Sequence, residues 1–190
     1  MSERLDPPSI EEAHAPPVWP VGEFRLRPMR LADAQAWHQY LCDPQVIEHT
    51  SFPMLDLADV ERMVANQLAG YANGTSCRWA VADSDDRLAG TCGFSNWSLP
   101  HSHAELVYDL SPAFHGRGLM RAAVTQVLDW AFGRARFNRV HAFVMTSNTR
   151  SIRLLESAGF SREGTLREYR VARGTPRDFH VYSRLASGRS

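Results

Sequence analysis

Apolar residues of the segment after residue 118 recur at spacings of three and four along the chain. They are Met120, Ala123, Val124, Val127, Leu128 and Ala131. This spacing puts them on one face of an amphipathic helix, and it is the strongest helical pattern in the sequence. A weaker pattern predicts a helix from Ala34 that Pro44 ends. Another predicts a helix capped by Asp56 and closed by Gly70 and Gly74.

Extended apolar runs and alternating patterns predict strands in the rest of the chain. They cover residues 24–27, 79–82, 88–97, 104–110, 140–145, 160–171 and 177–185. Asn148 can cap a short helix that runs through Ser157 and that Gly159 terminates. The strand–helix–strand step around residue 118 implies local parallel pairing, and hairpins imply antiparallel pairing elsewhere. We therefore expect an α/β fold over residues 21–186, with one mixed, twisted sheet of about seven strands and helices on both faces.

The two ends of the chain carry no such periodicity. Residues 1–20 contain five prolines among acidic and small residues: Pro7, Pro8, Pro16, Pro17 and Pro20. We expect them to form a flexible, proline-rich arm, and residues 187–190 to form a short tail. The sequence shows no apolar signal core and no apolar run of membrane-spanning length, so a cytoplasmic location is expected.

The composition of the chain limits the partners and the catalytic chemistry that we expect. The chain has 190 residues, with 21 basic and 21 acidic side chains and a formal net charge of zero, so charge gives no reason to expect a nucleic-acid or membrane partner. The basic side chains are all arginines, and without lysine the chain has no Schiff-base nucleophile. The cysteines Cys42, Cys77 and Cys92 form no Cys-x-x-Cys pair, which is typical of reduced thiols in a cytosolic protein.

Gly116 and Gly118 stand between a predicted strand and the strongest predicted helix. Glycine allows the backbone to turn sharply and a ligand to approach, and a helix start binds anions. A Walker loop is excluded because it needs lysine. A dinucleotide fingerprint fits poorly, since Arg121 stands where its third glycine belongs. A plain strand-to-helix turn without a ligand stays open.

The sequence around these glycines resembles a known family. His115-Gly-Arg-Gly-Leu-Met120 is similar to the Gln/Arg-x-x-Gly-x-Gly/Ala loop that binds the pyrophosphate of acetyl-CoA in GNAT acyltransferases, with His115 and Met120 as departures. Residues 148–151 and 155–164 resemble the Asn-x-x-Ser … Gly-Phe-x-x-Glu-Gly signature of the RimJ/RimL-like branch. The first strand, residues 26–33, and the last, residues 178–185, are also similar. The resemblance covers about residues 22–186.

The resemblance implies a GNAT fold and an N-acetyltransferase that uses acetyl-CoA as co-substrate and needs no metal. In this family the strand before the loop bulges and separates from the next strand, and the pantetheine arm pairs with its free edge. The resemblance implies a side-chain contact from Asn148 to this arm. As a helix cap the residue needs no ligand, so a purely structural role stays open, and the two roles are compatible. The cofactor-binding residues implied are Tyr108, Asp109, Leu110, His115, Gly116, Arg117, Gly118, Leu119, Met120, Arg121, Asn148 and Arg153.

The catalytic groups follow from the same resemblance. Many relatives use a tyrosine as the acid for the leaving thiolate, but the matching residue here is Leu155, so Ser151 is the candidate acid. Glu105, on the central strand, is the first candidate for the base that takes the proton of the attacking amine. Its rivals are Asp109, His115 and His103.

The acceptor is less constrained by the sequence. The RimJ/RimL-like resemblance favours a protein N-terminal α-amine and direct transfer, without a covalent enzyme intermediate. A small amine such as a polyamine or an antibiotic is the alternative, and so is a non-catalytic acyl-CoA-binding domain of the same fold. A homodimer also stays open. His101 and His103 could suggest a metal pair, but no third ligand accompanies them.

Overall fold

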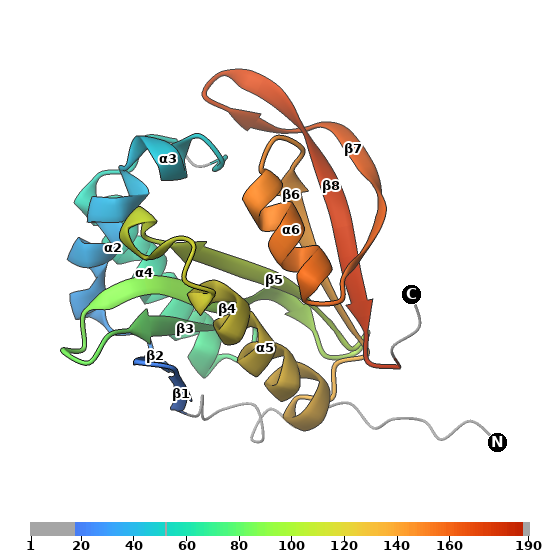
Figure 1. Cartoon of the computed structure of the whole chain (residues 1–190), viewed down its shortest axis with the longest axis horizontal. Helices are drawn as coiled ribbons and strands as arrows, with labels where there is room; N and C mark the ends of the chain where they lie inside the picture. The colour runs from blue at the N-terminus through green and yellow to red at the C-terminus, as the bar shows by residue number, and fades with distance from the viewer. Residues whose placement is uncertain (1–17, 52, 188–190) are drawn as a thin grey trace.

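The computed structural model describes residues 18–51 and 53–187 (Figure 1). Residues 1–17 and 188–190, which hold most of the predicted arm and tail, lie outside the described residues. Within the described part, eight strands form one sheet in the order β1-β2-β3-β4-β5-β6-β8-β7. Their bounds are Trp19–Val21, Phe24–Pro28, Cys77–Ala82, Leu88–Ser98, His103–Leu110, Arg139–Met145, Ser161–Ala172 and Thr175–Leu185 for β1 to β8. Strands β5 and β6 pair in parallel and the other neighbours are antiparallel, which confirms the mixed sheet.

Five α-helices in the described part cover the two faces of this sheet. They are α2 Ala34–Leu41, α3 Pro44–Ile47, α4 Leu57–Ala72, α5 Leu119–Asp129 and α6 Thr149–Ser157. Helices α5 and α6 share one core with the sheet, and α2 and α4 share another on the opposite face (Figure 1). The prediction of helices on both faces is therefore confirmed.

Helix α5 follows the apolar pattern closely. Ala123, Val124, Val127 and Leu128 are all fully buried against the sheet. Burying a leucine side chain of this kind contributes on the order of 1.5–3 kcal/mol, so the stripe outweighs the modest helix propensity of its two valines. This packing fixes where the helix begins, directly after Gly118.

The predicted arm is wrong at its last residues, because Trp19–Val21 forms strand β1. Val21 is buried, and the ring of Trp19 lies 5.5 Å from that of Trp79. A three-residue strand that contains Pro20 is too short to show alternation in the sequence. Its stability comes from pairing with β2 and from this aromatic contact.

One predicted helix end is wrong, and a second is right only for Gly74, which follows the end of α4 with φ of +65°. Pro44 begins α3 instead of ending the preceding helix, because Asp43 caps the new helix through the backbone N–H of Gln45. Gly70 lies inside α4, which ends at Ala72. A Cβ at Gly70 would lie 2.2 Å from Ser76 Oγ, so glycine is needed there for close approach of the following turn.

Strands β5 and β6 separate after a short parallel contact. They pair only through residues 103–105 of β5 and 139–141 of β6. The resemblance also implied a bulge at the end of β5, and this is wrong: the β4–β5 register runs without a shift from Gly90↔Leu110 to Ser95↔Glu105. The irregularity lies at the other end, between Ser95 and Ser98. Residues 106–110 therefore present an edge that β6 does not cover.

Candidate active site

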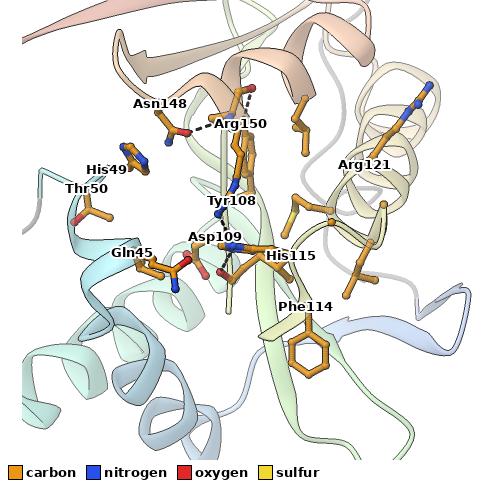
Figure 2. A pocket seen from close by; sticks show the side chains of 18 residues that line it. Gln45, His49, Thr50, Tyr108, Asp109, Phe114, His115, Arg121, Asn148 and Arg150 are labelled. Carbon is orange, nitrogen blue, oxygen red and sulfur yellow. Dashed lines mark hydrogen bonds between the residues drawn. The ribbon is translucent and has the colours of Figure 1, made fainter. Parts of the chain in front are cut away.

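A cavity of about 310 Å³ opens where β5 and β6 separate (Figure 2). It crosses the sheet, because α3 packs with the core of one face while α6 packs with the core of the other. Its walls come from β5, from the glycine loop with the start of α5, from the start of α6, and from α3 with the residues after it. The lining residues are Gln45, Val46, His49, Thr50, Tyr108, Asp109, Leu110, Phe114, His115, Gly116, Gly118, Leu119, Met120, Arg121, Asn148, Arg150, Ser151 and Leu154.

The glycine loop forms one wall of this cavity. Gly116 and Gly118 have φ of +77° and +72°, a left-handed conformation that favours glycine, and a Cβ on either would meet no atom within 4 Å. The first backbone bond of α5 runs from the Ala122 N–H to the Gly118 carbonyl. The N–H groups before Ala122 therefore point out of the helix start, where its dipole is positive. Open space beside these donors fits a pyrophosphate group.

His115 ties this loop to the neighbouring elements. Arg150 donates to His115 Nδ1 over 2.6 Å, so the ring proton is on Nε2, which lies 3.1 Å from the Leu110 carbonyl oxygen and donates to it. His115 thus holds the strand end and the start of α6 together. Arg150 lines the cavity although the sequence analysis missed it. Its position in the first turn after Asn148 was the available signal.

Ser151 lies at the start of α6, beside Tyr108 of β5. Asn148 caps the helix by accepting a bond from the Ser151 N–H over 3.1 Å, which leaves its amide NH₂ for other contacts. The hydroxyls of Tyr108 and Ser151 share a hydrogen bond. Burial raises the pKa of Tyr108 well above its usual value, so this phenol stays protonated.

Asp109 lies on the face of β5 opposite to Tyr108 and is the centre of a buried polar network. Tyr40 and Arg78 each donate to its carboxylate, and Thr91 Oγ1 donates over 2.9 Å. The Arg78 guanidinium also stacks on Trp37, 4.8 Å from the ring centroid. Desolvation, followed by the charge of Asp109, raises the pKa of Tyr40, which keeps this phenol protonated as a donor. The network occupies both carboxylate oxygens.

Three predicted site residues do not line the cavity. The Arg117 guanidinium lies 5.6 Å from the ring centroid of Phe114, and Arg153 is exposed on α6. Glu105 lies where β5 still pairs with β6, so the sheet is closed beside it. Its carboxylate accepts from Asn96 Nδ2 over 3.1 Å, and Arg170 lies 3.6 Å away.

The histidine pair of the sequence analysis lies outside the cavity too. The rings of His101 and His103 are 6.3 Å apart and stacked. Across residues 18–51 and 53–187, no group of three or more histidine, cysteine or acidic side chains is placed to hold a metal ion. Nor does any helix in that part of the chain have the length and apolar character needed to cross a membrane.

The fourth wall of the cavity was not predicted. Gln45 and Val46 of α3 line it together with His49 and Thr50. The turn between β7 and β8 reaches over this segment, as the upper part of Figure 1 shows, and Arg173 of that turn donates to the carbonyls of residues 47, 48 and 50. These contacts join residues more than a hundred positions apart, and no local pattern in the sequence indicates them.

A sheet that opens between two parallel strands, beside a helix start with free N–H groups, is an arrangement typical of acyl-CoA-dependent transferases. The chain belongs to the GNAT family: the model of the acetyltransferase (GNAT) domain matches residues 23–161. The protein is an N-acetyltransferase, and its neighbours in sequence and structure include the RimJ/RimL-like ribosomal-protein acetyltransferases. Membership of the family implies acetyl-CoA as the acyl donor.

Three similar proteins illustrate the relationship. The chain is 35% identical over 165 residues to the uncharacterized N-acetyltransferase p20 of Bacillus licheniformis, covering 84% of this chain and 91% of the relative. It is 30% identical over 119 residues to the ribosomal protein uS5-alanine N-acetyltransferase of Escherichia coli, covering 62% and 61%. The structure of Mycobacterium smegmatis RimJ in complex with CoA-disulfide superposes with a TM-score of 0.80 at 25% identity, covering 90% and 87%.

Proposed function

We propose that this enzyme transfers an acetyl group directly from acetyl-CoA to the N-terminal α-amine of a protein. The observation that carries the proposal is the cavity that crosses the sheet, because the glycine loop and α3 line the same cavity. The donor can then enter from one face and the acceptor from the other. The 30% identical uS5-alanine N-acetyltransferase supports a protein acceptor.

On the donor side, the backbone N–H groups at the start of α5 would hold the pyrophosphate of acetyl-CoA, with Arg121 and Arg150 adding charge-assisted contacts from the cavity wall. The uncovered edge of residues 106–110 would hold the pantetheine arm. Bound acetyl-CoA supplies a thioester carbonyl as the acyl donor. Asn148 would orient the arm through its amide, which the helix cap leaves partly free.

Ser151 is the proposed proton donor to the leaving thiolate. Its hydroxyl lines the cavity and is bonded to the Tyr108 hydroxyl, so a proton that Ser151 gives up can be replaced from a neutral phenol. Leu155, at the position where many relatives have a tyrosine acid, is fully buried and has no donor. The Tyr108–Ser151 pair supplies the donor that this position lacks.

The cysteines support direct transfer. Cys77 and Cys92 are buried, and burial raises the pKa of both thiols far above the neutral range, which suppresses the reactive thiolate. Cys42 is exposed but does not line the cavity. An acetyl-cysteine intermediate therefore has no suitable nucleophile beside the donor site.

The charges of the acceptor wall favour a peptide over a polyamine. Among the described lining residues Asp109 is the one carboxylate, and its oxygens are already bonded to Arg78, Tyr40 and Thr91. A polyamine carries several positive charges that need unpaired carboxylates. A peptide needs a site for one amine and hydrogen bonds for its backbone, which Gln45 and Thr50 can supply.

Turnover with a defined set of acceptors tests this function. Thiol release from acetyl-CoA is measured with a ten-residue peptide that begins with alanine, with spermidine and with an aminoglycoside, and mass spectrometry locates the acetyl group. We expect acetylation of the peptide α-amine. Modification of the small amines alone would make the enzyme a small-molecule acetyltransferase. Binding of acetyl-CoA with no turnover across the set would favour a non-catalytic domain.

The role of Ser151 is tested by Ser151→Ala. Removing a general acid lowers turnover by about 10²–10⁴-fold, and we expect kcat to fall while acetyl-CoA affinity changes little. Ser157→Ala is the matched control, since Ser157 lies on the same helix, is exposed and only bonds the Leu154 carbonyl. An unchanged kcat in Ser151→Ala would remove this residue from the mechanism.

A further inference from the structure

Amine acetylation needs a group that accepts a proton, because an α-amine is largely protonated at neutral pH and must be neutral to attack. The candidates named from the sequence each have a structural obstacle. Glu105 lies outside the cavity, paired with Asn96 and close to Arg170. The oxygens of Asp109 already accept bonds from three side chains.

The two histidine candidates, His115 and His103, are also unsuitable as the base, for different reasons. Both ring nitrogens of His115 are engaged, one by Arg150 and the other by the Leu110 carbonyl. The ring of His103 lies 5.5 Å from that of His141, outside the cavity lining. None of the candidates predicted from the sequence is therefore an unengaged base facing the cavity.

His49 differs from the other candidates in its position: His103 also has a buried Nδ1 without a partner in the described part of the chain, but only His49 combines this with a place on the cavity wall. It lines the cavity directly after α3, and its Nδ1 is buried with no hydrogen-bond partner among the described residues. Leaving a buried polar nitrogen unpaired costs about 1–3 kcal/mol, so an unpaired group on a cavity wall needs an explanation. Figure 2 shows His49 and Thr50 on the α3 side of the cavity, across from Arg150 and Tyr108.

The charges around this wall keep the imidazole available. The ionisable groups that share the cavity are Tyr108 and Asp109 of β5, His115 of the loop, Arg121 of α5 and Arg150 of α6. Asp109 is neutralised by Arg78, and Tyr108 stays protonated. From the β7–β8 turn, Arg173 binds the carbonyls on either side of His49, and Glu48 is the adjacent acid. No carboxylate bonds the ring, so His49 can accept a proton from a cationic acceptor.

We propose that His49 is the general base that deprotonates the acceptor amine; this rests on the acetyl transfer proposed above. The acceptor ammonium gives one proton to the His49 imidazole, directly or through one water. The neutral amine then forms a C–N bond with the acetyl carbonyl carbon, the C–S bond breaks, and the thiolate takes a proton from Ser151. The second proton that the amine nitrogen loses as it becomes an amide returns to Ser151, so the serine hydroxyl is restored. The products are an acetamide, free CoA thiol and a protonated His49, which returns its proton to solvent.

The test is the pH dependence of kcat/KM for the alanine peptide in wild type and in His49→Ala. A side-chain base acts only in its deprotonated form, so wild-type kcat/KM should rise with pH as that base loses its proton. In His49→Ala we expect a fall of about 10²–10⁴-fold at pH 7, and a rise displaced toward the titration of the α-amine near about pH 8. Added imidazole should restore part of the rate at pH 7.

His101→Ala is the matched control, because His101 is an exposed histidine outside the cavity lining. It should keep the wild-type rate and pH profile. Acetyl-CoA should raise the melting temperature of both variants as in wild type, which excludes a folding defect. A His49→Ala variant with an unchanged pH profile, or one that loses rate without rescue by imidazole, would overturn the role of His49. A wild type that acetylates none of the acceptors would instead overturn the proposed function.

Discussion

The two sides of the cavity are built in different ways. The side proposed to bind the donor comes from two short stretches, residues 108–121 and 148–154, which include the starts of α5 and α6 with their free N–H groups. The acceptor side comes from α3, the residues after it and the tip of the β7–β8 hairpin, which meet only in the folded chain. On the donor side, backbone N–H groups act together with the side chains of Arg121, Asn148 and Arg150 in the proposed site. We expect the acceptor side, which is lined by side chains of α3 and the residues after it, to set specificity.

The largest effect should come from the donor side. Gly118→Val places a side chain in the open space beside the helix start, in a backbone conformation with φ of +72°. We expect loss of the thermal shift that acetyl-CoA causes, which for a ligand at 100 times its dissociation constant is about 2.7 kcal/mol, or roughly 5–10 °C.

Gly174→Val is the matched control for this substitution. Gly174 has φ of +74° and open space around it, but it lies in the β7–β8 turn. Both variants pay about 1–2 kcal/mol for the left-handed conformation. Only Gly118→Val should lose the acetyl-CoA shift. If folded Gly118→Val keeps that shift, the loop is a plain turn.

The next largest effect concerns Asp109 of β5, on the wall that the donor and acceptor sides share. Asp109→Ala leaves the Arg78 charge buried without its partner; their side chains are 13% and 8% exposed. We expect a loss of about 3 kcal/mol in the free energy of unfolding, measured with urea. Asp85→Ala removes an exposed ion pair with Arg87 and should cost less than about 0.5 kcal/mol. Equal losses in the two variants would mean that the Asp109 network adds nothing beyond a surface pair.

A smaller effect should appear on the acceptor side alone. Arg173→Ala removes the bonds that hold the hairpin tip to the carbonyls after α3. Losing about 1 kcal/mol of such contacts should raise the acceptor KM by about fivefold and leave acetyl-CoA affinity unchanged. Arg177→Ala, an exposed arginine of β8, is the control and should change neither. An altered acetyl-CoA affinity in Arg173→Ala would show that the two sides are not separable.

These differences explain what the sequence could predict. The stripe from Ala123 to Leu128 has a helical period and the glycine loop has local geometry, so both are recognisable from neighbouring residues. Strand β1 has three residues and a proline, and it depends on a distant tryptophan. His49 could not be found because its significance lies in an unpaired nitrogen on a cavity wall. Glu105 was favoured because strand order alone does not reveal where β5 and β6 separate.

The smallest predicted effect concerns Glu163, which lies outside the cavity lining and serves as a reference for the other variants. Arg139 and then Ser183 hold the pKa of Glu163 at about 2, through hydrogen bonds to its carboxylate. A carboxyl whose pKa is lower in the folded than in the unfolded protein stabilises the fold at pH values above its unfolded pKa. That contribution is lost as the pH falls through the folded pKa. The stability advantage of wild type over Glu163→Gln should therefore shrink between about pH 5 and 2. It should not exceed about 1 kcal/mol at pH 7, since this side chain is 42% exposed. A constant difference across that range would contradict the assignment.

The central claim is that donor and acceptor enter one cavity from opposite faces of the sheet. Amide chemical shifts, recorded by NMR during stepwise addition of CoA and then of the alanine peptide, test it most directly. We expect CoA to shift the amides of residues 116–121 and 151, and the peptide then to shift those of residues 45–50 without displacing CoA. A peptide that competes with CoA, or that leaves residues 45–50 unchanged, would contradict the account.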